Sequence, residues 1–405
     1  MEIKQLSRPV VDKVAVIGGG LGGLATAIAL RKQGIDAHVY ERAKEFRPVG
    51  AGLALFPNGL NSLEAISAGI VENLKRASCQ LDQSVFSKHT GERITQSTAT
   101  HQEKYGHPTL LFWWWRLQQV LACALPPEVI HLGYRSIGFE QDENGVTAYF
   151  DGDKSVRADL LIGTDGINSL VRKTLIGDGE PRYLGSMSWR AVSEYNHELL
   201  NLNELIFMKR EQKVIYFFDV GGGYRCWTLR ALMPKSSVHE SAAEIKSRIV
   251  DQFSGWWEPL RGSMEATDPE QIVFSPICDR PPLKSWSQGR VTLLGDAAHP
   301  MAPSLALGAN STFEDAYELA QCLSQSSSIA EALTTYENRR IPRTQVFQAQ
   351  SALAEQRFYV TDIGTQDPEK AARERVALEE FHNWVYGYDP NSESRLKPWM
   401  EISAT

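Results

Sequence analysis

The sequence predicts an α/β fold in which a parallel sheet and its helices are interrupted by an inserted antiparallel sheet and followed by C-terminal helices. Three observations predict this fold. A strand, a glycine-rich loop, a helix and a second strand follow one another over residues 14–42. Alternating apolar runs, separated by three glycines at 221–223, occupy residues 180–275 and are typical of antiparallel strands. Helices are predicted over 308–325 and 329–358.

The first segment, VAVIGGGLGGLATAIALRKQGIDAHVYER, has the glycine spacing of a dinucleotide-binding βαβ unit. Gly18 makes the tight turn, Gly20 removes a side chain where phosphates must approach, and Gly23 lets the helix pack against the strand. Glu41 ends the second strand, where its carboxylate can accept hydrogen bonds from both ribose hydroxyls of an adenosine. These residues predict an adenine dinucleotide, and the acid disfavours a 2′-phosphate. The competing interpretation is a structural βαβ unit without a ligand.

The following elements are predicted in chain order. Residues 50–67 form a loop and a short strand that turn at Pro57-Asn58-Gly59 into a helix. Residues 81–100 are strand-like and leave the first domain. The chain returns to that domain as a helix over 115–125. Then come a strand at 129–132, a hairpin near 142–145, a buried strand at 158–163, a helix near 241–253 and an apolar strand at 291–294.

Length and composition limit the classes of function. With 405 residues the chain predicts two or three lobes. A net charge of -7 disfavours a nucleic-acid or anionic-membrane surface. No apolar segment approaches the roughly 20 residues that span a bilayer, and the N-terminus lacks the apolar core of a signal peptide, so a cytoplasmic protein is expected. A monomer and a homodimer are both open.

Cysteine usage argues against a disulfide framework and against a zinc site. The cysteines are odd in number, lie far apart and form no CxxC, so buried reduced thiols are expected. They are Cys79, Cys123, Cys226, Cys278 and Cys322. No pair of histidines has metal-ligand spacing, and no metal is predicted.

Three consecutive tryptophans, Trp113-Trp114-Trp115, form part of the most apolar cluster of the chain. They cannot all face one side of a regular element. At least one of them is therefore expected to meet a ligand, another domain or a partner, and the other two to pack in the core.

Two further motifs follow predicted strands. In GTDGINSLVRKTL (163–175), Asp165 and Arg172 are by themselves consistent with a helix cap and an ion pair. In GRVTLLGDAAHPMAPSLALGANSTFEDAYELAQCL (289–323), Asp296 ends a strand and is placed to accept a hydrogen bond from a ribityl hydroxyl. Gly308-Ala309-Asn310 opens a helix whose positive end can face an anionic ring, and a reduced flavin is such a ring.

Together these segments resemble the single-component FAD-dependent aromatic hydroxylases and monooxygenases, which include salicylate hydroxylases and zeaxanthin epoxidases. The resemblance spans most of the chain. The motifs are VAVIGGGLGGL with VYER, LLIGTDGINSLVR, and GRVTLLGDAAHP with GANSTFEDA. Supporting matches are VGAGLALFPNGL (49–60), Trp189-Arg190-Ala191, DRPPLKSWSQGR (279–290) and YENRRIPR (336–343).

The resemblance implies a Rossmann-like FAD-binding domain, an inserted antiparallel sheet that covers the flavin, and no separate nicotinamide domain. The expected FAD-binding domain is discontinuous and comprises 1–80, 101–178 and 276–345. The expected substrate-binding domain comprises 81–100 and 179–275, and a C-terminal helical segment covers 346–405.

The resemblance also implies the reaction. NADH or NADPH, bound transiently, reduces the flavin, and dioxygen then forms a flavin hydroperoxide whose distal oxygen is delivered to an electron-rich carbon. The protein excludes water from that intermediate. The expected substrate is a hydrophobic aromatic or polyene compound that is hydroxylated or epoxidised. The alternatives are a flavin oxidase or dehydrogenase without oxygen insertion, and a non-catalytic binding protein of the same fold.

Site residues follow from the matched motifs. Asp165 is expected to link the flavin and nicotinamide sites, and Arg42 to help with phosphate or nicotinamide. His299 belongs to the flavin loop and is expected to act through backbone geometry. Candidates for the substrate wall, each with core packing as the alternative, are Trp189, Arg190, Tyr216, Phe218 and Trp227. No residue is identified as a general base.

The sequence departs from the family pattern at two places. Relatives usually have PxxGQGxN where this chain has PSLALGAN, so Ala306 and Leu307 replace a glycine and a glutamine beside the flavin. Their extra apolar bulk is expected to crowd or dry the dioxygen pocket. On the LQQVL alignment, the flavin-contacting arginine of the family falls on Trp114. Either Arg116, two places later, substitutes for that arginine or the contact is missing.

Overall fold

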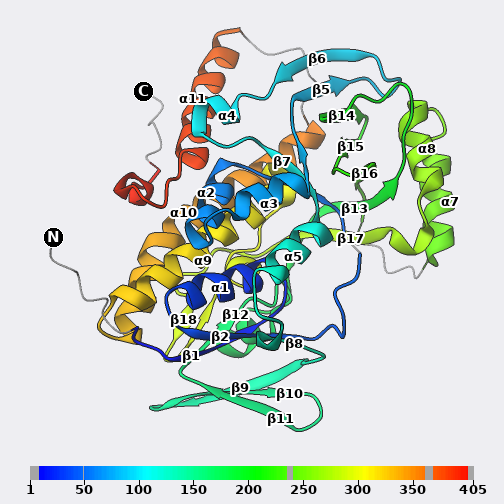
Figure 1. The fold of residues 1–405 in the computed structure, drawn as a ribbon. Coiled ribbons are helices and arrows are strands. Elements are labelled where there is room, and N and C mark those ends of the chain that lie inside the picture. The colour runs from blue at the N-terminus through cyan, green and yellow to red at the C-terminus, as the bar shows by residue number, and fades with distance from the viewer. Residues whose placement is uncertain (1–8, 49, 235–239, 361–367, 400–405) are drawn as a thin grey trace.

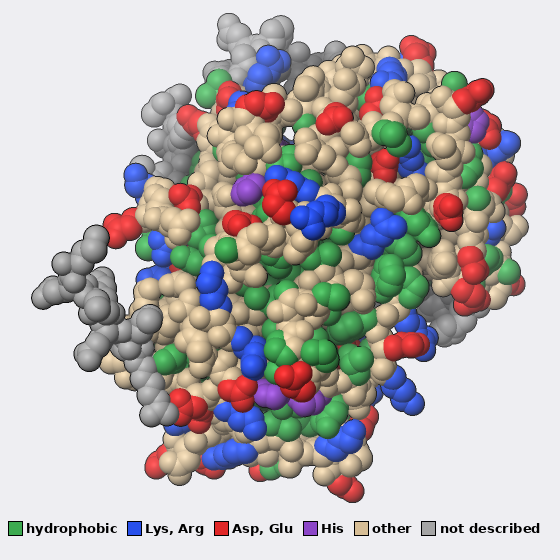
Figure 2. Space-filling model, viewed as in Figure 1, with side chains coloured by type: hydrophobic (Ala, Val, Ile, Leu, Met, Phe, Trp, Pro, Cys, Tyr) green, Lys and Arg blue, Asp and Glu red, His purple; other side chains and the backbone are tan. Residues whose placement is uncertain are grey.

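The computed structural model describes residues 9–48, 50–234, 240–360 and 368–399 (Figure 1). Two large sheets dominate these residues, with helices packed on both. None of the helices in the described part of the chain has the length and hydropathy needed to cross a membrane. On the face drawn in Figure 2, acidic and basic side chains are interspersed and hydrophobic ones gather across the middle.

The first large sheet has six strands in the order β18-β19-β12-β1-β2-β8. The strands are β1 (Lys13–Ile17), β2 (Asp36–Glu41), β8 (Ile130–Leu132), β12 (Leu160–Gly163), β18 (Ser287–Gln288) and β19 (Val291–Leu293). All neighbours are parallel except the edge pair β18–β19. The loops that follow β1, β2, β12 and β19 therefore meet at one edge of the sheet, where open α/β sheets bind ligands.

Helices and a small sheet cover the six-stranded sheet (Figure 1). The helices include α1 (Leu21–Lys32), α5 (Trp114–Cys123), α6 (Leu170–Leu175), α9 (Gly308–Gln325) and α10 (Ile329–Val360). The small sheet is β9 (Ser136–Asp142), β10 (Gly145–Phe150) and β11 (Lys154–Ala158). Helix α1 packs against α5 and α9, and its side chains from Leu24 to Leu30 are all buried. Burial of this helix on nearly all sides fixes the loop that precedes it.

The second large sheet has seven strands in the order β17-β13-β16-β15-β14-β5-β6. The strands are β5 (Gln83–Ser87), β6 (Arg93–Thr98), β13 (Arg182–Glu194), β14 (Glu204–Arg210), β15 (Lys213–Asp219), β16 (Tyr224–Leu232) and β17 (Val273–Asp279). Every pair is antiparallel except β5–β14. The strand-like segment 81–100 thus pairs with the later antiparallel strands, and β17 crosses the expected domain boundary at residue 275.

The two faces of the seven-stranded sheet differ because side chains alternate along each strand. The outer face packs under α7 (Ala242–Gln252), which was predicted, and α8 (Glu258–Ala266), which was not. Its buried side chains include Met187, Trp189, Ala191, Phe217 and Trp227. The inner face turns toward a small connecting sheet made of β3 (Gly52–Leu55), β4 (Cys79–Gln80) and β7 (Leu110–Trp113).

The remaining elements complete the first domain and the C-terminal end. They are α2 (Pro57–Ile66), α3 (Ile70–Arg76), α4 (His101–Tyr105), α11 (Pro368–Tyr386) and the 3₁₀ turns η1 (Pro127–Val129), η2 (Pro269–Gln271), η3 (Gly295–Ala297), η4 (Pro303–Leu305) and η5 (Glu393–Leu396). Helix α11 contacts α2 and lies beside α4 (Figure 1). No disulfide joins the five cysteines, all of which lie in the described residues; Cys123 is exposed and Cys278 half-buried, contrary to the expectation of burial.

Candidate functional site: a dinucleotide cradle facing an inserted sheet

The loop between β1 and α1 is shaped by its glycines. Gly18 has φ +116°, and a Cβ on Gly23 would lie 1.9 Å from the Gly18 carbonyl oxygen. A Cβ on Gly20, by contrast, would meet nothing within 4 Å. Gly20 is the N-cap of α1 and offers no side chain to the first-turn N–H groups. The loop therefore leaves open space in front of unpaired amides, which is the arrangement that binds a phosphate.

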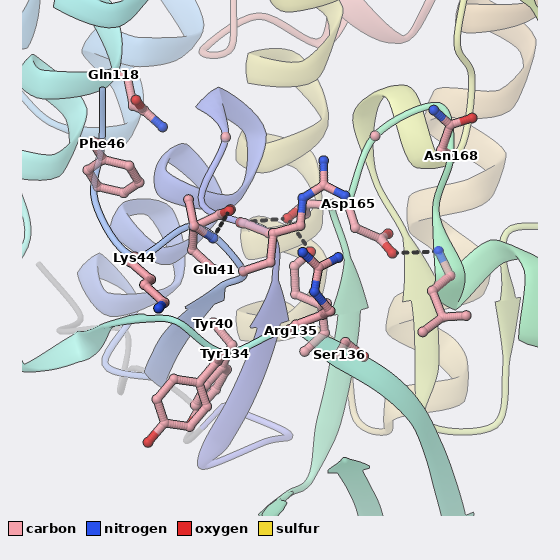
Figure 3. A pocket seen from close by; sticks show the side chains of 18 of the residues that line it. Tyr40, Glu41, Lys44, Phe46, Gln118, Tyr134, Arg135, Ser136, Asp165 and Asn168 are labelled. Atoms are coloured by element: carbon pink, nitrogen blue, oxygen red, sulfur yellow. Dashed lines mark hydrogen bonds between the residues drawn. The ribbon is translucent and has the colours of Figure 1, made fainter. Parts of the chain in front are cut away.

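Glu41 is held against this loop (Figure 3). Its carboxylate accepts hydrogen bonds from the backbone N–H of Gly19 at 2.6 Å and of Ala43 at 2.7 Å. Each carboxylate oxygen has a further lone pair for a ligand. The backbone bonds fix where the acid points, and its contact with a ribose stays a prediction.

A cavity of about 870 Å³ opens between the end of β2 and the end of β12. This volume lies within the range of natural ligand pockets. Its lining includes Gly18, Gly20, Glu41, Arg42 and Asp165 from the predicted site, and we call this site the dinucleotide cradle. Lining residues that the motifs did not identify are Lys44, Phe46, Arg47, Gln118, Tyr134, Arg135, Ser136 and Asn168. Of these, Gln118 lies in the quoted motif LQQVL and Asn168 in GTDGINSLVRKTL, and the others lie outside the quoted motifs.

Helix α5 contributes two side chains to the cradle. Gln118 is buried and donates to the Gly19 carbonyl at 2.8 Å, and Trp114 lines the cavity. Trp113 and Trp115 instead pack against each other with ring centroids 5.1 Å apart. One of the three tryptophans thus faces the predicted ligand, and the other two pack between the domains.

Arg116 lies elsewhere. It donates to the Gly221 carbonyl at 2.8 Å and its guanidinium stacks over the Tyr224 ring at 4.9 Å, so it ties α5 to the turn between β15 and β16. It is not among the residues that line the cradle. Arg116 thus occupies a contact between the domains, which favours the second of the two alternatives, namely that the arginine contact to the flavin is missing.

Asp165 caps helix α6 while it lines the cavity (Figure 3). Its carboxylate accepts from the Ser169 hydroxyl and from the Leu170 N–H at 2.7 Å. Burial raises the pKa of Asp165, against the effect of these hydrogen bonds. The cap suggested by the sequence is therefore present, but Arg172 pairs with Asp178 and not with Asp165. The role of Asp165 between flavin and nicotinamide stays a prediction. Arg172, fully buried, donates to the Ala298 carbonyl at 2.9 Å and so fixes the loop after Asp296.

Asp296 lies beside the N-terminus of α9. Its Oδ1 is 3.8 Å from the position that a Cβ on Gly308 would take. The residue is exposed, and desolvation by the surrounding protein raises the pKa of its carboxyl group. Beneath it, the buried His299 Nε2 contacts Asp315 Oδ2 at 2.5 Å. An exposed carboxylate beside a helix N-terminus fits the predicted ribityl contact.

The start of α9 departs from expectation. Ala306 adopts φ +53°, a left-handed conformation in which a glycine is usual. Leu307 is 2% exposed and packs with Phe347, Phe381, Val385 and Tyr386, so it points into the C-terminal helices. The expected crowding of a dioxygen pocket by Leu307 is therefore wrong. Its apolar side chain is used to dock α10 and α11.

Asn310 and its neighbours join α9 to the segment after β3. The Asn310 side chain accepts from the Phe56 N–H at 2.8 Å and donates to the Ala54 carbonyl at 3.0 Å. It is fully buried. Asn310 therefore positions the segment around β3, while Gly308 and the half-buried Ala309 form the first turn of α9.

The residues predicted to contact the substrate lie on two different faces of the inserted sheet. Trp227 donates its Nε1 to Thr267 at 3.0 Å and Trp189 stacks on Phe274 at 5.1 Å, both on the outer face. Side chains alternate between the two faces of a strand, and those of Trp189 and Trp227 point toward α7 and α8. Both are therefore core residues and not part of the predicted substrate wall. Arg190, Tyr216 and Phe218 lie on the inner face, as their strand neighbours Trp189 and Phe217 face outward.

Three inner residues form what we call the middle row, namely Arg190, Thr228 and Tyr216, which are direct cross-strand neighbours. On one side of the row, Cys226 Sγ accepts from the Gly52 N–H at 3.0 Å. On the other side, Arg230 reaches the Pro303 carbonyl at 3.5 Å. The row therefore faces the space between β3 and the turn that precedes α9, both parts of the first domain.

No set of His, Cys, Asp and Glu side chains within the described ranges could hold a metal ion.

Comparisons with known proteins cover both parts of this site. A family model described as "FAD binding domain" matches residues 12–252 and 270–351. The chain is 31% identical over 341 residues to the aurachin C monooxygenase/isomerase of Stigmatella aurantiaca, across 84% of this chain and 87% of that protein. It is 32% identical over 364 residues to the chloroplastic zeaxanthin epoxidase of Spinacia oleracea, across 84% of this chain and 53% of that protein, about half its length.

Among solved structures, the crystal structure of Klebsiella pneumoniae HpxO complexed with FAD and uric acid has a TM-score of 0.81 and 26% sequence identity. The match covers 92% of this chain and 95% of that chain. The six-stranded sheet, the inserted sheet and the C-terminal helices thus recur together in one arrangement.

Proposed function

Since this chain belongs to the FAD binding domain family and is an FAD-dependent monooxygenase, we propose a more specific reaction for it. In this reaction the protein uses NADH or NADPH and dioxygen to hydroxylate a hydrophobic aromatic compound. The predicted resemblance and the predicted α/β fold with its inserted antiparallel sheet are confirmed. The choice of reductant and of substrate class is the proposed part.

The position of the middle row is the observation that carries the proposal. The row lies between two segments of the first domain. The inner face contacts these segments through hydrogen bonds to the Gly52 N–H and the Pro303 carbonyl. Beside it, Tyr216 packs on Phe207 with ring centroids 5.2 Å apart, and Phe207 lies 6.0 Å from Phe358. A wall of rings next to a few polar groups suits an aromatic substrate better than a long apolar polyene.

The residues of the cradle, together with Asp296 beside α9, would bind and orient the cofactor. FAD, when bound, would accept hydride from NADH or NADPH and would activate dioxygen. The open amides at Gly20 would hold its pyrophosphate, Glu41 its adenosine ribose and Asp296 its ribityl chain. The inserted sheet, closed on the first domain by its inner-face contacts, would exclude water from the reacting carbon.

An oxidase that does not insert oxygen is the second candidate. Ala306 favours it, because this residue replaces a glycine that relatives usually have next to the flavin. Leu307 gives that candidate no support, since its side chain packs among the C-terminal helices.

The test is to purify the protein with FAD, record its visible spectrum, and screen aromatic and polyene compounds for faster NADPH oxidation under ¹⁸O₂. The expected result is a product heavier by one labelled oxygen atom, formed from an aromatic compound. Hydrogen peroxide in stoichiometric amount without a labelled product would support the oxidase. A colourless protein that takes up no added FAD would overturn both candidates.

A further inference from the structure

Two arginines on the inner face of the inserted sheet, Arg190 and Arg230, differ in whether they are paired with an acid. Arg230 pairs with Glu355 of α10 at 3.2 Å, and both are buried. Glu355 also accepts from the Ser186 hydroxyl at 2.7 Å, from the Tyr359 hydroxyl at 3.2 Å and from the Ser304 hydroxyl. The lone pairs of this carboxylate are therefore consumed by neighbours.

Arg190 has no such partner. Within the described residues its guanidinium makes neither a hydrogen bond nor an ion pair, although it lies half-buried at one end of the middle row. Burial, and after it the positive charge of Arg230, lowers the pKa of Arg190. An enclosed cation beside a second cation is costly unless an acceptor satisfies it. The cost is removed if an anionic ligand is bound there.

The residues around Arg190 indicate which other chemical groups such a ligand would carry. Its cross-strand neighbour Thr228 is buried, and next in the row Tyr216 has a pKa raised by burial to about 12, so its hydroxyl stays protonated at neutral pH. The rings of Phe207 and Phe358 pack around Tyr216. The row therefore offers a guanidinium and hydroxyl donors at one end and aromatic rings at the other.

We propose that Arg190 anchors the substrate, and that the substrate is an aromatic compound with an acidic oxygen, a carboxylate or a phenolate, that lies against the guanidinium. This inference rests on the proposed monooxygenase function and narrows its substrate class. Guanidinium groups bind such oxygens through charge-assisted hydrogen bonds. A neutral polyene would leave Arg190 unsatisfied, and this is the physical reason for preferring an acid.

The test uses the FAD-loaded protein and two matched pairs of probes, salicylate with salicylamide and 2-naphthoate with 2-naphthamide. Each is titrated while the absorbance of the bound flavin is recorded. Salicylate or 2-naphthoate is expected to bind roughly 10- to 100-fold more tightly than its amide, as expected for a hydrogen bond to a charged group. Arg190→Gln should remove this preference, and Arg190→Lys should retain part of it because the positive charge remains.

Arg210→Gln is the matched control, since Arg210 is an exposed arginine on strand β14 of the same sheet. It should leave the preference for acids unchanged. The FAD content of each variant, measured from its spectrum, reports whether the cradle is intact. The proposal is overturned if neither acid binds, if acid and amide bind alike, or if Arg190→Gln weakens both members of a pair equally. Failure of the wild-type protein to bind FAD would instead overturn the proposed function.

Discussion

In the dinucleotide cradle a glycine loop and its amides form the surface expected to meet phosphate, whereas the inserted sheet presents side chains to the space in front of the first domain. In the cradle, glycine positions, helix α1 and the amide-bound Glu41 define the surface. In the sheet, Trp189 and Arg190 are adjacent in sequence but serve opposite faces, one in a core and one in a row of polar groups. The comparison teaches that neighbouring residues of one strand can take unrelated tasks, whereas the expected phosphate surface depends on the position of a whole loop.

The largest expected effect lies in the cradle. Gly23→Ala would place a methyl group 1.9 Å from the Gly18 carbonyl oxygen, so the phosphate loop must move. We expect loss of nearly all bound FAD, measured by the flavin absorbance of the purified protein. Gly255→Ala is the matched control, because a Cβ there meets nothing within 4 Å. Normal FAD content in Gly23→Ala would show that the cradle is not set by its backbone.

The outer face of the inserted sheet should respond in stability. Trp227 is fully buried, and Trp227→Ala should lower the free energy of unfolding by about 3–5 kcal/mol, the usual cost of a large cavity in a core. Chemical denaturation followed by circular dichroism measures this loss. A decrease below about 1 kcal/mol would mean that the face under α7 and α8 is not a packed core.

Asp296→Ala tests the carboxylate beside the N-terminus of α9. Removal of one charged acceptor should weaken FAD binding by about 1.5–3 kcal/mol while the protein remains folded. FAD titration of the apoprotein gives the affinity, and Asp296→Asn, which keeps an acceptor oxygen, should lose less. Full retention of FAD by the alanine variant would contradict the assignment of Asp296 to the ribityl chain.

The smallest expected effect on stability is at Arg190. Arg190→Gln removes an enclosed charge that has no partner among the described residues, so the free energy of unfolding should change by less than about 1 kcal/mol or rise. The same denaturation experiment as for Trp227→Ala measures it. A large loss of stability would place Arg190 in the packing of the sheet, and the contrast between its two faces would disappear.

The parts of the fold that local sequence determines were predicted well. The βαβ unit at 14–42, the hairpin of β9 and β10, and helix α7 follow from glycine spacing, turn residues and apolar periodicity, all of which act over short stretches of chain. The cap formed by Asp165 was also evident from its motif.

Long-range packing explains what could not be predicted. Leu307 is directed by α11, which lies far along the chain, and Arg116 by the turn at Gly221. Whether Trp189 or Arg190 faces the first domain depends on which side of the sheet α7 and α8 cover. Alternation divides the strand into two sets, but it does not say which set is turned inward.

The parallel pairing of β5 with β14 affects how the protein is made. Gln83 pairs with Glu204, so the hairpin of β5 and β6 leaves the ribosome long before the strand that completes its sheet. Until then the hairpin has an open edge that can pair with another chain. Such distant pairings slow folding, because a long loop must close before the contacts are gained. Completion of the inserted sheet is therefore a late step in biogenesis, and the edge of β5 stays open to misassembly until β14 has been synthesised.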